Sequence, residues 1–231
     1  MTWIKICGTT NLEDARLAAE VGADALGFVF AKSPRRVTPE AVRDIAVELP
    51  ASVEIVGVFV NASPKQILDT VETAGLTGVQ LHDQESVESI REFRGQLAAG
   101  GRKVKLLAVW RLEEFPPTGA FALDFPTGAD QPDALLLDSR SPAARGGTGT
   151  SFDWKSWGTF LEMFRLRKSL PPLVVGGGLK PDNVGQAMRF LQPWGVDVVT
   201  GVEKEPGKKD SDKVRAFVQA VRQADKELRR P

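Results

Sequence analysis

Short apolar runs alternate along this chain with segments that have the periodicity of amphipathic helices, and this alternation limits the fold more than any other feature. Nearly continuous apolar strands are typical of a parallel sheet covered on both faces. Parallel strands need crossover connections, which the intervening helices supply. We expect strands at residues 3–6, 25–30, 54–60, 78–81, 104–110, 134–137, 173–175 and 196–200. Eight such units predict an α/β fold, a (β/α)8 TIM barrel, over residues 1–231 as a single domain.

Helix signals fill the intervals between these runs. Asn11, Thr38 and Ser63 are good N-cap residues, and proline follows the latter two at the first helical position. Residues 111–133 carry a weak helical pattern and predict a short helix or an irregular loop, and residues 204–209 predict a charged loop. An open doubly wound sheet is the competing architecture, but it would normally use fewer strands. We expect helices over 11–21, from 39, from 64, over 84–97 and 153–168, from 181, and over 210–228.

Composition removes several classes of function. Lys and Arg together number 30, as do Asp and Glu, so no basic excess favours a nucleic acid or an anionic membrane as partner. No apolar run approaches the length of a membrane span, and the N-terminus lacks a signal-peptide pattern. The single cysteine rules out an internal disulfide framework and indicates a reducing, cytoplasmic compartment. With one histidine and one cysteine, no metal site is expected.

That cysteine, Cys7, ends the first apolar run just before the first helix. It should therefore stand at the mouth of a strand-to-helix loop, where barrels of this type carry out chemistry. Lys5 should point to the same side of the strand, and Gly8 lets the backbone approach a ligand. The helix that follows favours a thiolate through its N-terminal amides. A lone cysteine is also often a small buried hydrophobe, so the residues alone leave both roles open.

Glycines follow the last two predicted strands and indicate an anion site. Gly176, Gly177 and Gly178 leave the strand at 173–175 with no side chains in the way, so their amides can point at an anion. Gly201 offers the same after the strand at 196–200. Loops after strands seven and eight of such barrels often form a phosphate site. A run of glycines can also be a flexible turn, but the pairing with Gly201 favours phosphate.

Asp138 directly follows the apolar run at 134–137, so its carboxylate should face the barrel mouth. It could instead cap a helix or pair with a nearby arginine. Cys7 and Asp138 would lie roughly across the mouth from each other, an arrangement that suits an acid–base isomerase of a sugar phosphate. Arg35 could bind a carboxylate in a bidentate manner, although a solvated basic loop is equally compatible. His82 is a secondary candidate, because it is more often a packed residue than a base.

Ordered blocks along nearly the whole chain resemble the phosphoribosylanthranilate isomerase family of tryptophan biosynthesis. The first block is Lys5-Ile6-Cys7-Gly8-Thr9-Thr10. The others lie at 22–28, 33–35, 79–82, 137–138 with 146–149 and 152–154, 177–179 with 181–184, and 201–203 with 206–210. The resemblance implies an Amadori rearrangement, in which the aminoaldose N-(5-phosphoribosyl)anthranilate becomes the aminoketose 1-(2-carboxyphenylamino)-1-deoxyribulose 5-phosphate.

The same resemblance implies roles for individual residues. Cys7 would be the general base that removes the proton from the sugar C2, and Asp138 the general acid that opens the furanose ring. Arg35 would bind the anthranilate carboxylate. The remaining substrate-binding residues, mostly around the phosphate, would be Gly147, Gly177, Gly178, Thr200 and Gly201. No cofactor is implied, the partner is a small phosphorylated sugar–anthranilate, and both a monomer and a homodimer are compatible with such a barrel.

The chain departs from the family pattern at Asp83, at Val199-Thr200 and at Gly176, and its segment 111–133 is longer than usual. These departures bear on phosphate binding and on one side of the mouth. Two other sugar-phosphate enzymes are alternatives: an aminoimidazole-ribotide-precursor isomerase, which would place an aspartate where Cys7 stands, and a pentose-phosphate epimerase, which would need metal-binding histidines. A third alternative is a silent barrel that senses a phosphorylated ligand, against which an intact Cys7 and Asp138 argue.

Overall fold

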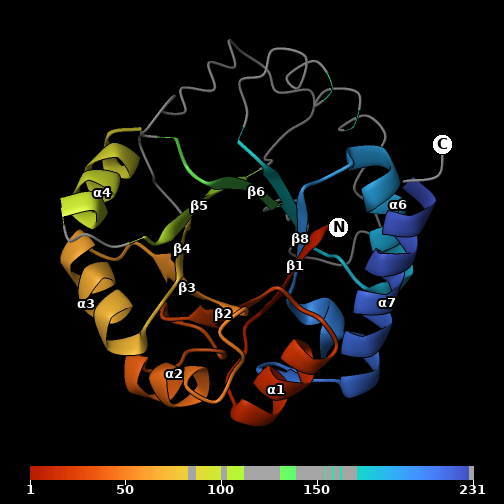
Figure 1. Ribbon diagram of the computed structural model, residues 1–231, viewed down its shortest axis with the longest axis horizontal. Coiled ribbons are helices and arrows are strands. Elements are labelled where there is room, and N and C mark those ends of the chain that lie inside the picture. The colour runs from red at the N-terminus through yellow and green to blue at the C-terminus, as the bar shows by residue number, and fades with distance from the viewer. Residues whose placement is uncertain are drawn as a thin grey trace.

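The computed structural model describes residues 1–82, 87–99, 103–111, 131–138 and 171–228, with Trp154, Gly158 and Glu162 as isolated residues. Within this part of the chain, parallel strands close into a barrel in sequence order, from β1 through β8 and back to β1 (Figure 1). The (β/α)8 TIM barrel predicted from the sequence is therefore confirmed. That residues 1–231 form a single domain stays a prediction.

The strands occupy nearly the predicted positions, with shifts of one or two residues at their ends. Strand β3 has the predicted bounds, whereas β6 takes in Asp138 and β8 ends two residues early. Their bounds are Trp3–Cys7 for β1, Ala25–Val29 for β2, Glu54–Val60 for β3, Gly78–His82 for β4, Lys105–Arg111 for β5, Ala134–Asp138 for β6, Leu173–Gly176 for β7 and Gly195–Val198 for β8.

Helices cover the outside of the barrel wherever the chain is described (Figure 1). The predicted caps are confirmed: the side chains of Asn11, Thr38 and Ser63 accept hydrogen bonds from the first turns of α1, α2 and α3, and Ser63 forms a capping box with Gln66. The helices are α1 (Leu12–Glu20), α2 (Pro39–Ala46), α3 (Pro64–Ala74), α4 (Val87–Ala99), α6 (Pro181–Leu191) and α7 (Ser211–Leu228).

The prediction of a charged loop at 204–209 is wrong. Glu203–Glu205 and Lys208–Lys209 form an antiparallel hairpin, β9 and β10, which follows the short 3-10 helix η3 at Thr200–Val202. Pro206-Gly207 makes the turn, and Gly207 has a φ of 83°, which glycine adopts without strain. Charged residues in this segment favoured a loop, but Glu203 and Lys209 are buried in the structure.

Several predicted segments lie outside the described residues. They are residues 83–86, most of 111–133, the loop 139–150 and the helix at 153–168, of which Trp154, Gly158 and Glu162 are each helical. Among the described helices, none is long and apolar enough to cross a membrane.

Strand alternation divides the apolar core into an outer layer, between strands and helices, and an inner layer inside the barrel. A polar layer lies above the inner one. On β1, Ile4 and Ile6 pack outward against the helices, while Trp3 packs inside the barrel. The inner layer consists of Trp3, Ala25, Val56, Leu107, Ala134, Leu136 and Val174. Lys5 and Cys7 follow Trp3 on the inward face of β1, so they lie above this apolar floor at the carboxyl end of the barrel. The candidate site occupies that end.

Candidate active site

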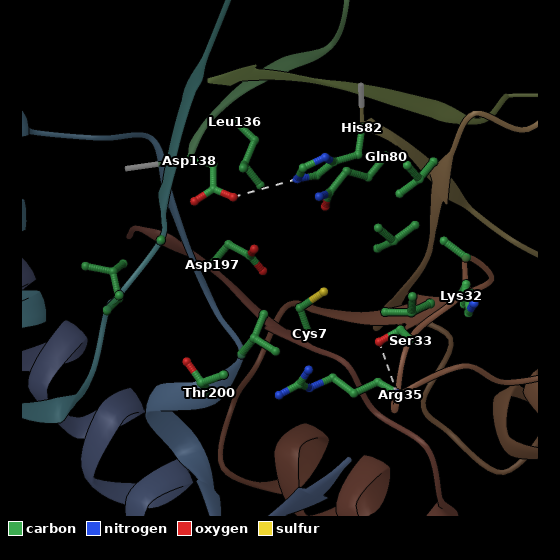
Figure 2. A pocket seen from close by; sticks show the side chains of 18 residues that line it. Cys7, Lys32, Ser33, Arg35, Gln80, His82, Leu136, Asp138, Asp197 and Thr200 are labelled. Atoms are coloured by element: carbon green, nitrogen blue, oxygen red, sulfur yellow. Dashed lines mark hydrogen bonds and ion pairs between the residues drawn. The ribbon is translucent and has the colours of Figure 1, made fainter. Parts of the chain in front are cut away.

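A cavity of about 260 Å³ opens at the carboxyl ends of the barrel strands. Figure 2 shows Asp138 and His82 on one side of it and Cys7, Arg35 and Thr200 on the other. The cavity brings together six of the residues predicted from the sequence: Cys7, Arg35, Asp138, Gly177, Gly178 and Thr200. Gly201 does not line it, and Gly147 lies outside the described residues.

Cys7 ends β1 as a free thiol that is only 4% exposed. The next residue, Gly8, has a φ of 72°, a conformation in which other residues are strained, and a Cβ there would lie 2.6 Å from the Cδ of Arg35. Burial raises the pKa of the Cys7 thiol, and the nearby positive charge of Lys5 lowers it by less. The net effect of these surroundings raises the pKa of the thiol, because burial has the larger effect.

Lys5 is fully buried beneath the thiol, as alternation along β1 predicts. Its ammonium donates hydrogen bonds to Gln80 Oε1 and to Asp197 Oδ1, both at 2.8 Å. Neither Gln80 on β4 nor Asp197 on β8 was identified from the sequence. The signal for Asp197 was available, since a polar residue within the apolar strand 196–200 faces Lys5 once β8 pairs with β1.

Asp138 is the last residue of β6, and its side chain is buried at the cavity wall. Its Oδ2 lies 3.7 Å from Nε2 of His82, the last residue of β4, which is the ion pair drawn in Figure 2. His82, considered secondary from the sequence, thus lines the same cavity as Asp138 and approaches its carboxylate. The distance is that of a charge interaction rather than of a direct hydrogen bond.

Arg35 reaches the cavity from the loop after β2, but its guanidinium is already engaged by a carboxylate of the chain itself. Its Nε donates to Glu203 Oε1 at 2.8 Å and its Nη2 donates to Glu203 Oε2 at 2.6 Å. Burial raises the pKa of Glu203, but the hydrogen bond from Arg35 and the charge of Lys209 together lower it by more. The pKa of Glu203 is therefore below its ordinary value. The sequence did not identify Glu203, which the hairpin β9–β10 carries under Arg35.

Lys209 of the same hairpin has no exposed side-chain surface. Its ammonium donates to the backbone carbonyl of Cys7 at 2.5 Å and to Glu203 Oε1 at 3.2 Å. Burial lowers its pKa below the usual range, against the raising effect of Glu203. One charged residue therefore ties the hairpin to both the Cys7 loop and the Arg35–Glu203 pair.

The glycines after β7 and β8 lie together, as the phosphate prediction requires. Gly177 and Gly178 have φ values of 75° and 74°, so the loop turns in a way that favours glycine, and both residues line the cavity. A Cβ at Gly201 would overlap the carbonyl oxygen of Leu179. Gly201 is thus required for the close approach of the two loops, while Thr200 lines the cavity.

Across the described residues, no group of three or more His, Cys, Asp and Glu side chains is placed to hold a metal ion. The polar groups at the cavity are a thiol, two carboxylates, an imidazole, a guanidinium, an ammonium, a side-chain amide, two hydroxyls and glycine-rich loops. That set can exchange protons with a small molecule and bind its anionic groups.

Comparison with known proteins assigns the family. The family model for N-(5'-phosphoribosyl)anthranilate (PRA) isomerase matches residues 4–220. This chain belongs to the PRA isomerase family. The N-(5'-phosphoribosyl)anthranilate isomerase of Chlorobaculum tepidum is 42% identical to it over 231 residues, covering 99% of this chain and 98% of that protein.

Solved PRA isomerases share the fold. The crystal structure of the enzyme from Thermotoga maritima is 37% identical, with a TM-score of 0.77 over 96% of this chain and all of that one. A PRA isomerase in complex with reduced 1-(o-carboxyphenylamino)-1-deoxyribulose 5-phosphate is 35% identical, with a TM-score of 0.73 and the same coverage. These chains match this one along nearly their whole length.

Proposed function

We propose that this chain is an N-(5'-phosphoribosyl)anthranilate isomerase of tryptophan biosynthesis, which rearranges its aminoaldose substrate to 1-(2-carboxyphenylamino)-1-deoxyribulose 5-phosphate by general acid–base catalysis. One observation carries the proposal beyond the family: a thiol and a carboxylate, on β1 and β6, face one cavity from opposite sides. An isomerisation that moves a hydrogen from one carbon to its neighbour needs a base at one place and an acid at another.

The reaction balances without an external oxidant. Protonation of the furanose oxygen by Asp138 lets the C1–O bond break while the anilino nitrogen forms a C=N bond with C1. Removal of the C2 proton by the Cys7 thiolate then gives an enolamine. Protonation at C1 and loss of the proton from the C2 hydroxyl give the aminoketose, so C2 is oxidised as C1 is reduced within one molecule. For these steps Cys7 must be deprotonated and Asp138 protonated at the start.

The anionic ends of the substrate would orient it between these two groups. Gly177 and Gly178 present amides that suit the phosphate, with Thr200 beside them. Arg35 would bind the anthranilate carboxylate while Glu203 holds its guanidinium in the cavity wall. Gly147 and Gly201 stay predicted binding residues, and the loop 139–150 is the segment we propose to close over the substrate.

Two further parts of the proposal are less specific. We keep the cytoplasm as the expected compartment, on the ground of a single cysteine that is a free thiol. We also keep both a monomer and a homodimer as the expected assembly, since the acid, the base and the described binding loops all come from one chain.

A fluorescence turnover assay tests the proposal. Anthranilate, phosphoribosyl pyrophosphate and the preceding transferase generate the labile substrate in place, and its fluorescence is lost as the isomerase consumes it. We expect rapid loss with the wild type and a fall in kcat of about 10²- to 10⁴-fold for both Cys7→Ser and Asp138→Asn. Activity untouched by Cys7→Ser would remove the thiol as the base. An inactive wild type would favour another sugar phosphate or a ligand sensor.

A further inference from the structure

Lys5 is a lysine with no exposed side-chain surface, on the inward face of β1 directly below the cavity. Burying an ammonium group is costly unless charged and polar partners compensate it. An apolar residue of similar length would fill this position above the inner core without that cost. The presence of a charge here therefore calls for an explanation in terms of what the ammonium touches.

Two of its partners hold the ammonium in place. Gln80 Oε1 and Asp197 Oδ1 each accept a hydrogen bond of 2.8 Å from Lys5 Nζ. An ammonium has three N–H donors, so these contacts leave one direction for a third group. Burial lowers the pKa of Lys5, but Asp197 and Cys7 raise it by more, and the group stays protonated.

Cys7 is the neighbour of Lys5 on the cavity side of β1. Lys5 and Cys7 meet over Gly27 of β2: a Cβ on that glycine would lie 2.5 Å from Cys7 Sγ and 3.0 Å from Lys5 Cε. The positive charge of the ammonium lowers the pKa of the thiol, against the larger raising effect of burial. Asp197 acts in the opposite direction on the thiol, because its negative charge disfavours a second one.

We infer that Lys5 is the counter-ion of the Cys7 thiolate, held beneath it by Asp197 and Gln80, and that it is the positioning residue that favours the thiolate form of the general base against the effect of burial. The inference rests on the proposed function, in which Cys7 must act as a thiolate. It adds what the sequence alone did not contain, namely the anchors that hold the ammonium in place.

Other charged groups also surround Cys7 and define the field in which it titrates. Lys209 donates to its backbone carbonyl, Arg35 packs over Gly8, and Glu203 pairs with both of these cations. Together with Lys5 and Asp197, these groups contribute three cations and two carboxylates, so the named neighbours of the thiol carry one excess positive charge. The cavity wall also carries Lys32, His82 and Asp138.

The single cysteine makes the inference directly measurable. The rate of alkylation by iodoacetamide, followed by intact mass between pH 5 and 10, reports the titration of Cys7 alone, and Cys7→Ser provides the blank. We expect Lys5→Met to raise the pH midpoint by about one to two units, since it removes the nearest cation. Asp197→Asn should lower the midpoint, because it removes the carboxylate while the ammonium remains.

Matched variants separate charge from packing. Lys5→Arg keeps the charge and should restore much of the wild-type midpoint. Lys105→Met removes a lysine that pairs with Glu54 at the opposite end of the barrel, and it should leave the midpoint unchanged. If Lys5→Met does not fold, as judged by circular dichroism, the downward shift in Asp197→Asn still decides the inference.

The same variants connect the titration to turnover. The acidic limb of the pH profile of kcat/KM should move with the alkylation midpoint in each variant. The assignment of Lys5 as the counter-ion would be overturned by equal alkylation midpoints in wild type and Lys5→Met. It would also be overturned by shifts of the same sign in Lys5→Met and Asp197→Asn. A shifted alkylation midpoint together with an unchanged acidic limb of the kcat/KM profile would overturn the role of Lys5 in turnover. Alkylation needs no substrate, so an inactive wild type would count against the proposed function while the midpoints still test the ion pair.

Discussion

The two sides of the cavity hold their proposed catalytic groups in different ways. On the Cys7 side, buried ion pairs join the strand ends to the hairpin: Lys5 to Asp197 at 2.8 Å, Arg35 to Glu203 at 2.6 Å, and Lys209 to Glu203 at 3.2 Å. On the Asp138 side, the described ion pair is the contact of 3.7 Å with His82. One side is a network of lysine, arginine and carboxylate charges, and on the other side the carboxylate lies beside an imidazole.

The difference matches what each proposed role requires. A thiolate base in a buried place needs cations close to it, and such cations are stable only when carboxylates hold them. A carboxylic acid that must carry a proton is served poorly by permanent cations, which would favour its ionised form. The comparison teaches that the fold surrounds the base with fixed ion pairs that offset part of the effect of burial, whereas the acid lies beside an imidazole.

The largest effect should come from crowding the base. In Gly27→Ala the new Cβ would lie 2.5 Å from Cys7 Sγ, so the sulfur must move and lose its place over Lys5. We expect kcat to fall about a hundredfold, the cost of misplacing a reacting group by about 1 Å. Gly95→Ala is the control, because that glycine lies in α4 with open space around it and the change should leave kcat unchanged. Equal activity in the two variants would contradict the tight packing of the base.

Removing the charge under Arg35 should have the next largest effect. Glu203→Gln keeps the shape of the side chain but weakens the pair that holds the guanidinium and Lys209. We expect KM to rise about tenfold with a smaller change in kcat, the loss of roughly one charge-assisted hydrogen bond. Glu205→Gln, on the exposed face of the same hairpin, should leave KM unchanged. A fall confined to kcat would place Glu203 in the chemical step instead.

A smaller effect is expected from the other side of the cavity. His82→Gln removes the titratable partner of Asp138 but keeps a polar side chain. We expect kcat to fall less than about tenfold, because the carboxylic acid itself remains. A loss as large as that of Asp138→Asn would show that His82 and Asp138 act as one unit and would remove the contrast between the two sides.

The smallest effect is the loss of thermal stability in Glu203→Gln, and the direction of its pH dependence follows from the pKa of Glu203. The pKa of Glu203 is lower in the folded chain than its ordinary value, so its stabilisation is fully present above the unfolded pKa of about 4.3 and is lost as pH falls through the folded pKa. At pH 7, Glu203→Gln should lower Tm by a few degrees. The difference from wild type should shrink as pH falls below the unfolded pKa, in thermal unfolding followed by circular dichroism. A constant difference would mean that packing rather than charge stabilises the hairpin.

Local sequence signals determined most of the described fold. Apolar runs such as Glu54–Val60 became strands because a barrel buries both of their faces, and Thr38-Pro39 and Ser63-Pro64 began helices because capping acts within one turn. Alternation along β1 correctly placed Lys5 on the same side as Cys7. The hairpin at Glu203–Lys209 was missed although Pro206-Gly207 signalled its turn, because the run of charged residues was interpreted as a loop.

Only the tertiary structure decided which groups surround the proposed catalytic residues. Asp197 and Gln80 meet Lys5 because barrel closure and strand register bring together residues 192 and 75 positions apart in the sequence. Glu203 meets Arg35 across 168 positions for the same reason. Periodicity in the sequence predicts which way a side chain faces along its own strand and where that strand ends. It therefore located the thiol and the carboxylate. The partners that set their charge come from other strands, and no local pattern records those contacts.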